Sequence, residues 1–167
     1  MFKATLASDA IKELPPYLSR GIKQVAFLDI PCPTDPYWRV AYKNPNHVSM
    51  AIDGGYTKFY LNPQTKEAFK GYMAHEAGHN IDKVGVWRFS NSKGWQEAVK
   101  KDDALYAAHL KGTHRVSSYA LTNDQEDFAE CIKAYITDRE YFKNAYPNRA
   151  AYIRKIAQVL SGHFKTP

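Results

Sequence analysis

Residues 75–79 read His-Glu-Ala-Gly-His, and this run constrains both the local structure and the chemistry of its segment. On an α-helix, positions i and i+4 lie on the same face, so His75 and His79 can direct two imidazole rings at one metal ion while Glu76 lies beside them. This pattern is typical of zinc hydrolases, although a motif this short also arises by chance and needs support from its surroundings.

The surroundings favour one continuous helix. Asn62 and Pro63 are residues that commonly begin a helix, and residues 64–83 contain no proline. One face of this helix carries, at spacings of four, three, four and three, Ala68, Tyr72, His75, His79 and Asp82. The histidines are therefore expected to point inward. Gly78 would let another segment approach the helix closely, with simple tolerance of a glycine as the alternative.

A third metal ligand is expected from another helix, because catalytic zinc usually takes three protein ligands and leaves one position to water. Residues 122–124, Thr-Asn-Asp, favour a helix start. Apolar residues follow at helical spacing, namely Phe128, Cys131, Ile132, Tyr135 and Ile136. Glu126 and Glu130 share a face beside this stripe, so we interpret Glu126 as the third ligand.

Each acidic residue also has a simpler interpretation. Glu126 could close a capping box with Asn123, unless Thr122 begins the box and leaves Glu126 for the metal. Glu130 is either a solvated glutamate or the acceptor of a ring N–H from a ligand histidine, and Asp82 is a similar candidate.

Together these residues resemble the catalytic domain of anthrax lethal factor and the related bacterial Pro-Pro endopeptidases. The resemblance covers roughly residues 65–160 and depends on residues 75–82, on Tyr119 and on the run Glu-Asp-Phe-Ala-Glu at 126–130. It implies a gluzincin-type site with one Zn²⁺ per chain. In that family the two motif histidines, here His75 and His79, and the first of the two glutamates hold the ion.

The resemblance implies a zinc-dependent endopeptidase that hydrolyses peptide bonds with a metal-activated water. Glu76 would accept a proton and later deliver it to the leaving amine. Tyr119, seven residues before Glu126, would donate its phenolic hydrogen to the developing oxyanion. The alternative is that Tyr119 packs half-buried like many of the 12 tyrosines.

Two branches of this family imply different substrates. The Pro-Pro branch implies a Pro-rich secreted or surface protein, and the lethal factor branch implies host signalling proteins. Pro-Pro enzymes carry paired glutamates at the ligand position, whereas Gln125 precedes Glu126 here, so proline specificity stays open. Tyr37 and Trp38 are either an aromatic wall for a proline-containing peptide or a packed edge. A catalytically inactive zinc-containing binding module is a further alternative, although it would have no need of Glu76.

Length and composition agree with a single catalytic domain over residues 1–167. We expect the α+β class, with a small N-terminal mixed α/β lobe that holds a short twisted sheet, a mainly helical C-terminal lobe, and an active-site cleft between them. The expected helices are 9–20, interrupted at Pro15 and Pro16 and ended by Gly21, then the motif helix, 94–110, the Glu126 helix and 147–160. The expected strands are 24–30, which we expect to be buried, then 38–43, 48–53 and 57–61. Gly54 and Gly55 would form the turn between the last two strands. Either strand 48–53 or strand 57–61 could pair with an extended substrate.

The net charge of +6 raises nucleic-acid binding as another class of function. The basic residues form no dense block, however, and nucleic-acid binding explains none of the candidate zinc ligands, so we expect no nucleic-acid partner. We expect the basic surface to favour an acidic polypeptide substrate or cell-surface partner through steering. The chain has no apolar run of membrane-spanning length, so we expect no membrane span, and we expect a monomer. Residues 1–10 do not read as a signal peptide, and the resemblance suggests secretion after removal of a leader.

Cys131 lies on the apolar stripe and is expected to be a small buried residue, with a ligand or disulfide role as the alternative. Cys32, between two prolines, is expected to be a loop thiol, and the disulfide state stays open. The remaining histidines are expected on the surface or in packing, with His114 close enough to Tyr119 to line the cleft. They are His47, His109, His114 and His163.

Overall fold

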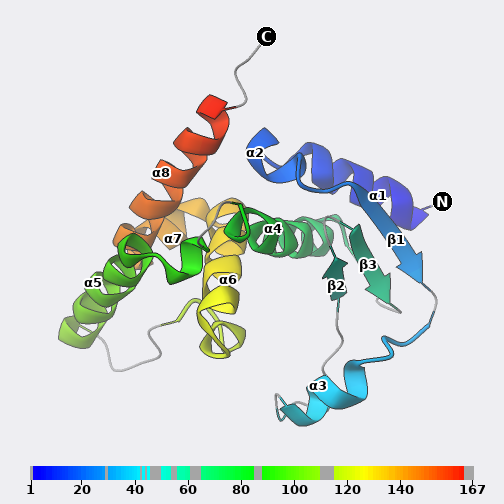
Figure 1. The fold of residues 1–167 in the computed structure, drawn as a ribbon, viewed down its shortest axis with the longest axis horizontal. Coiled ribbons are helices and arrows are strands. Elements are labelled where there is room, and N and C mark those ends of the chain that lie inside the picture. Colours follow the sequence, from blue (N-terminus) through cyan, green and yellow to red (C-terminus); the bar gives the residue numbers. More distant parts are fainter. Residues whose placement is uncertain are drawn as a thin grey trace.

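The computed structural model describes residues 2–28, 30–41, 43, 45, 50–53, 56–60, 65–84, 88–109 and 115–163. A small sheet lies beside a mainly helical body, which agrees with the α+β class (Figure 1). The elements are α1 (Phe2–Lys12), α2 (Pro16–Ser19), β1 (Gln24–Leu28), α3 (Asp35–Ala41), β2 (Met50–Asp53), β3 (Tyr56–Tyr60), α4 (Lys66–Asp82), η1 (Phe89–Asn91), α5 (Lys93–His109), η2 (Tyr119–Leu121), α6 (Asp124–Thr137), α7 (Arg139–Ala145) and α8 (Pro147–His163).

The sheet has the strand order β1-β3-β2. β3 pairs in parallel with β1, from Gln24↔Tyr56 onward, and antiparallel with β2, from Met50↔Phe59 onward. The predicted pairing of the last two strands is therefore confirmed, while Gly54 and Gly55 lie outside the described residues. The strand predicted at 24–30 is confirmed as β1, but its predicted burial is wrong, because β1 is an edge strand and is only half-buried.

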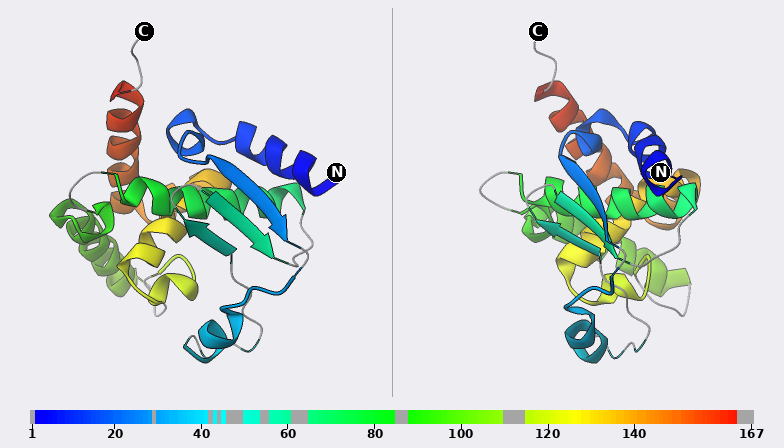
Figure 2. Two further views of the ribbon diagram at one scale, coloured as in Figure 1. Left: turned by 45° about the vertical axis from the view of Figure 1, so that its right-hand side comes forward. Right: turned by 90° about the vertical axis from the view of Figure 1, so that its right-hand side faces the viewer.

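One face of the sheet packs on α4 (Figure 2). Thr57 and Phe59 are buried while Tyr56 is exposed, which is the alternation of a strand with one face on the core. The rings of Phe27 and Phe59 lie 5.7 and 5.0 Å from the ring of Phe69 in α4. The sheet therefore rests on the N-terminal half of the helix that carries the histidine motif.

The N-terminal helices break at Pro15 and Pro16, as predicted, and end before Gly21. The first helix begins at Phe2 and not at residue 9. Ala7 and Ala10 are buried at helical spacing, and α1 packs along α4. Tertiary packing therefore extends this helix beyond any local start signal.

The strand predicted at residues 38–43 is wrong, because α3 occupies Asp35–Ala41. Pro36 lies in the first helical turn, and Asp35 pairs with Arg39 one turn later at 3.9 Å. α3 projects from the body (Figure 1), Tyr37 is 68% exposed, and its ring meets that of Trp38 edge to face. This corrects the interpretation of the two aromatic residues as a packed edge of a sheet.

The helices predicted at 94–110 and 147–160 correspond to α5 and α8. Between them, α7 is a short helix that the sequence analysis missed, and the Asp138 side chain caps it by accepting from the Tyr141 amide. One hydrophobic core runs through the helices, from Ala7 in α1 to Leu160 in α8. Every described helix is too short or too polar to cross a membrane.

The most extensive helix contact joins α4 and α6, which cross near the C-terminal half of α4 (Figures 1 and 2). A Cβ atom on Gly78 would lie 3.0 Å from the Ala129 Cα and 3.3 Å from the Ile132 Cβ. The prediction that Gly78 permits close approach of another segment is therefore confirmed.

We expect Gly78→Ala to lower the free energy of unfolding by about 1–3 kcal/mol, because the added methyl group overlaps backbone that must move. Gly71→Ala in the same helix is the matched control, since its Cβ would meet only side-chain atoms at 3.7 and 3.9 Å. This control should be neutral or more stable by about 0.5–1 kcal/mol. Urea denaturation of the two variants measures both values, and equal stabilities would contradict the packing argument.

Candidate metal centre

α4 holds the histidine motif in its buried C-terminal half. The helix is capped by Thr65, whose side chain accepts from the Ala68 amide at 3.2 Å. The predicted start at Asn62 and Pro63 is therefore wrong for the described helix, and these two residues lie outside the described ranges. His75 is buried, and His79, one turn later, is half-buried.

Three side-chain atoms of α4 and α6 converge on one point. The Nε2 atoms of His75 and His79 are 3.1 Å apart, and Glu126 Oε2 lies 3.3 and 3.2 Å from them. Ligands at about 2.0–2.1 Å from a tetrahedral zinc ion are separated by about 3.3–3.4 Å. The three atoms therefore have nearly the spacing of three corners of a zinc site.

Glu126 Oε2 supports this interpretation further. It is a buried oxygen with no hydrogen-bond partner among the described residues, although two ring nitrogens lie close to it. Buried polar atoms normally have a partner, and a cation held by this oxygen and the two imidazoles would supply one. Among the described residues, this is the group of histidine and acidic side chains whose geometry suits a metal ion. The donor set of two imidazoles and one carboxylate fits zinc.

Glu130 occupies the position that the sequence analysis predicted. Its Oε1 lies 2.9 Å from His75 Nδ1, so it can accept the ring N–H and leave Nε2 free for a metal. Lys133 donates to the same oxygen at 3.0 Å. Glu130 therefore fixes the orientation of the His75 ring.

Asp82 does not lie against a histidine, and that prediction is wrong. Both oxygens of its buried carboxylate accept hydrogen bonds from Ser90, one from the amide at 2.7 Å and one from the hydroxyl at 2.9 Å. Asp82 therefore fastens η1 to the end of α4.

The start of α6 serves as both a helix cap and a ligand support. Asn123 Oδ1 accepts from the Gln125 and Glu126 amides at 3.0 and 2.9 Å, so Asn123 is the N-cap and the alternative cap at Thr122 is wrong. The backbone of Glu126 is thus capped while its carboxylate reaches the histidines. Glu126 therefore takes part in the cap through its amide, while its carboxylate lies at the histidines and does not complete the capping box among the described hydrogen bonds.

The two predicted catalytic side chains are close to the ligands. Glu76 follows His75 in α4 and is buried, and burial raises the pKa of its carboxyl group although the two histidines lower it. Tyr119, in η2, has its ring centroid 5.8 Å from that of His75. The structure therefore gathers His75, Glu76, His79, Tyr119, Glu126 and Glu130 at the meeting of α4, α6 and η2.

The electrostatics of the centre reflect the carboxylates of Glu126 and Glu130. Burial lowers the pKa of His75, but its contacts with these two carboxylates outweigh burial and raise the pKa to about 9. Burial likewise raises the pKa of each glutamate, and the contacts with the histidines outweigh it and lower both values to about 2. The metal-free site therefore holds a proton on His75 at neutral pH.

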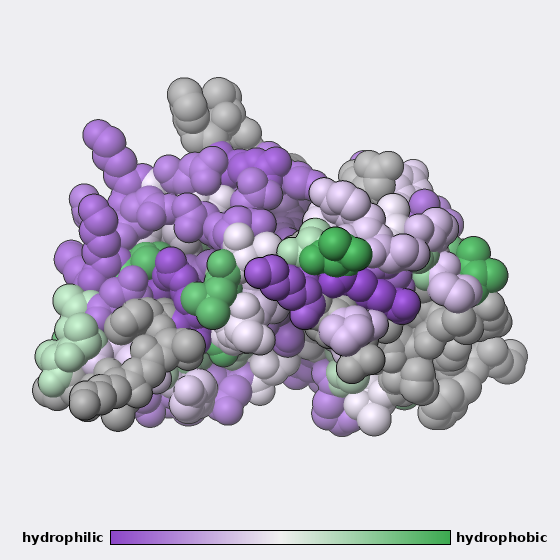
Figure 3. All heavy atoms as spheres, turned by 90° about the horizontal axis from the view of Figure 1, so that it is seen from below, coloured by the Kyte–Doolittle hydropathy of each residue, from purple (hydrophilic) through white to green (hydrophobic). Residues whose placement is uncertain are grey.

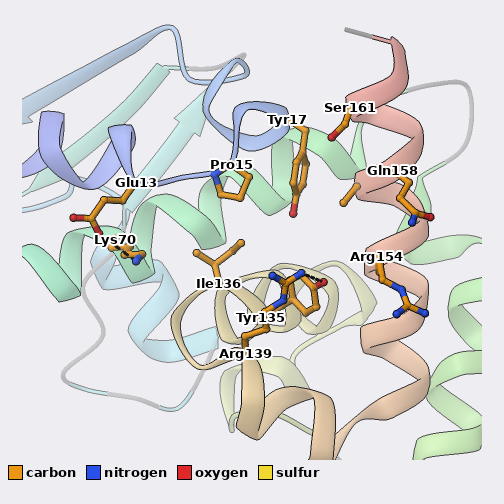
Figure 4. A pocket seen from close by; sticks show the side chains of 11 residues that line it. Glu13, Pro15, Tyr17, Lys70, Tyr135, Ile136, Arg139, Arg154, Gln158 and Ser161 are labelled. Atoms are coloured by element: carbon orange, nitrogen blue, oxygen red, sulfur yellow. Dashed lines mark hydrogen bonds and ion pairs between the residues drawn. The ribbon is translucent and has the colours of Figure 1, made fainter. Parts of the chain in front are cut away.

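A cavity of about 500 Å³ lies elsewhere, between α2, α4, α6 and α8 (Figure 4). Tyr17 points into it, and burial raises the pKa of this tyrosine to about 12. Arg139 donates to the Tyr135 hydroxyl and lies over its ring at 4.6 Å. The described residues that line this cavity include no member of the metal centre.

The remaining predicted residues play no part in the described centre. Cys131 is fully buried as expected, Cys32 is a loop thiol as expected and is also buried, and both are free thiols. Nothing is described of the His47, His109, His114 and His163 side chains.

On the face seen in Figure 3, hydrophilic residues predominate and the hydrophobic ones occur as separate spots.

The sequence analysis gave no role to Arg149, which is a buried residue in the structure. Arg149 is fully buried beside Asp127, which follows the ligand Glu126 directly. Arg149 of α8 contacts Asp127 of α6 and Asp103 of α5, and these residues are far apart in the sequence. Residue spacing therefore gives no signal that they meet.

We expect the apparent zinc affinity of the protein to rise about tenfold per pH unit between pH 7 and 9, because the metal must displace the proton of His75. The pKa of about 9 sets the upper end of this range. Competition with a chromophoric chelator at several pH values measures the slope. Glu130→Gln removes a carboxylate that raises the pKa of His75, so zinc affinity should change less with pH in this variant. A zinc affinity that does not change with pH in the unaltered protein would contradict the assignment.

No protein-family model matches this chain, and neither does any curated protein or solved structure. The resemblance to the lethal factor family therefore stays a prediction that rests on the motif residues and their spacing. The convergence of two histidines from α4 with one glutamate from α6 is independent of any relative.

Proposed function

We propose that this chain is a zinc-dependent endopeptidase. The observation that carries the proposal is the spacing of His75 Nε2, His79 Nε2 and Glu126 Oε2, which lie 3.1–3.3 Å apart on two helices. A bound zinc ion supplies a Lewis acid that activates water at neutral pH. A structural zinc site normally has four protein ligands, whereas three leave a position for water.

The proposed mechanism assigns proton transfer to Glu76. Burial raises the pKa of Glu76 toward the range in which a carboxylate can both accept and return a proton near neutral pH. It would take a proton from the attacking water and deliver it to the leaving amine. Tyr119 would donate its phenolic O–H to the oxyanion that develops on the scissile carbonyl. Glu130 holds the His75 ring throughout.

The proposed substrate is an extended polypeptide that pairs with β2. β3 already pairs on both sides, so of the two strands that the sequence suggested, only β2 has an outer edge without a partner strand among the described residues. The net charge of +6 favours an acidic substrate through steering. The resemblance further suggests secretion and a Pro-rich secreted or surface protein as the substrate, with host signalling proteins as the other branch.

We expect Glu76→Gln to lower peptide turnover by about 10²–10⁴-fold while zinc stays bound, because the variant keeps all three ligands and loses the general base. Glu126→Gln should lose zinc on gel filtration. Turnover of a diverse peptide library, measured with and without a chelator, tests the first expectation, and metal analysis tests the second. Glu97→Gln, at an exposed glutamate, is the control and should change neither. A zinc protein without chelator-sensitive cleavage would instead support the inactive binding module.

We expect Tyr119→Phe to lower kcat by about 10²-fold without loss of zinc or stability, as for removal of one oxyanion donor. Tyr141→Phe, an exposed tyrosine on α7, is the matched control and should leave kcat unchanged. Single-turnover measurements on a cleaved peptide give the rates. An unchanged rate in Tyr119→Phe would remove Tyr119 from the mechanism.

A further inference from the structure

A cluster of charged side chains lies on another face of α6, next to the metal ligand. Asp127, the residue after Glu126, is buried, and its Oδ2 lies 3.3 Å from Arg115 Nη1 and 4.0 Å from Arg149 Nε. The mechanism proposed above uses none of these three side chains. A buried carboxylate beside a ligand therefore has a role still to be explained.

Arg149 connects Asp127 to the neighbouring helices α5 and α8. Its side chain is fully buried in α8, and its Nη2 lies 3.1 Å from Asp103 Oδ1 in α5. Its amide and that of Asn148 donate to the buried carboxylate of Asp102 at 3.0 and 2.9 Å. The cluster thus joins α5, α6 and α8, which gives Asp127 a rigid position.

Arg115 connects the cluster to the proposed catalytic tyrosine. It lies four residues before Tyr119, in the segment that leads into η2, and its side chain is 22% exposed. Ser117 in the same segment contributes to the lowered pKa of the Glu130 carboxyl group and accepts from the Ala120 amide at 3.2 Å. The ion pair with Asp127 of α6 therefore holds the start of the segment that carries Tyr119.

We infer that Arg115 and Asp127 are positioning residues that set Tyr119 against the metal ligands through their ion pair. This inference rests on the proposed endopeptidase function. Because the same helical turn presents Glu126 to the histidines and Asp127 to Arg115, one rigid helix holds both the candidate metal ligand and the segment that leads to Tyr119. A displacement of about 1 Å in such a group can lower a rate by about 10²-fold.

The test is a double-mutant cycle between Arg115→Gln and Tyr119→Phe. Arg115 is chosen because it reaches solvent, whereas Asp127→Asn would leave the fully buried Arg149 poorly paired and endanger folding. Arg115→Gln should lower kcat by about 10-fold or more, with KM and zinc stoichiometry unchanged. In the Tyr119→Phe background the same substitution should cost less than about 2-fold, because the tyrosine hydroxyl is already absent.

Two further variants separate positioning from plain stabilisation. Arg115→Lys keeps the charge and should retain most of the activity, while Arg154→Gln removes an exposed arginine of α8 outside the cluster and should leave kcat unchanged. Hydrogen exchange of the zinc-loaded protein should accelerate in Arg115→Gln at the Ala120 and Thr122 amides, which bond within the tyrosine segment.

Equal losses of kcat from Arg115→Gln in both backgrounds would overturn the inference while leaving the endopeptidase intact. Unchanged kcat in Arg115→Gln would overturn it as well. Absence of chelator-sensitive turnover in the unaltered protein would overturn the proposed function and the inference with it.

Discussion

The close approach of α4 and α6 at Gly78 and Ala129 is the constraint on which the metal centre depends. Zinc ligands lie only about 2.0–2.1 Å from the ion, so two helices can share one ion only if their backbones come close. A Cβ on Gly78 would lie 3.0 Å from the Ala129 backbone, which leaves no room for a larger side chain. The glycine lies between the two histidines of the motif, so the residue that permits the contact is flanked by the residues that use it. Glu126 then meets both imidazoles within a few tenths of an ångström of the spacing that zinc requires.

Charge balance explains why the side chains hold this arrangement without a metal. Glu126 and Glu130 both touch His75, and removing two carboxylates from water is costly unless a positive charge compensates. The raised pKa of His75 places a proton there at neutral pH, and the lowered pKa of each glutamate keeps it ionised. A divalent cation supplies the same compensation more strongly. The side-chain positions that suit a protonated His75 would also suit a divalent cation held by the same three atoms.

The sequence predicts those parts of the site and fold that depend on short-range spacing. The i and i+4 histidines of α4, the apolar stripe of α6 and the antiparallel pair β2–β3 follow from periodicity and turn residues, and the structure contains them. The aromatic and β-branched residues of α3 favour a strand, which is why the sequence predicts one there. The helix-starting residues Asp35 and Pro36 and the pairing of Asp35 with Arg39 stabilise a helix instead. The burial of Arg149 has no local signal, since its acidic partners are distant in sequence. The spacing of Asp82 from His79 predicts that it accepts a hydrogen bond from a ligand histidine. Instead, both of its carboxylate oxygens accept hydrogen bonds from Ser90 in η1.

One turn of α6 joins the metal centre to the rest of the molecule. Five successive side chains of α6 each contact another part of the molecule: Glu126 and Glu130 meet the histidines of α4, Asp127 meets Arg115, Phe128 meets Trp95 and Ala129 lies against Gly78. A helix presents successive residues about 100° apart, so five residues cover all sides of the rod. A rotation of α6 that improves one of these contacts must weaken another. The metal ligand, the support of the tyrosine segment and the core packing therefore fix one another, and substitutions within this turn should not act additively.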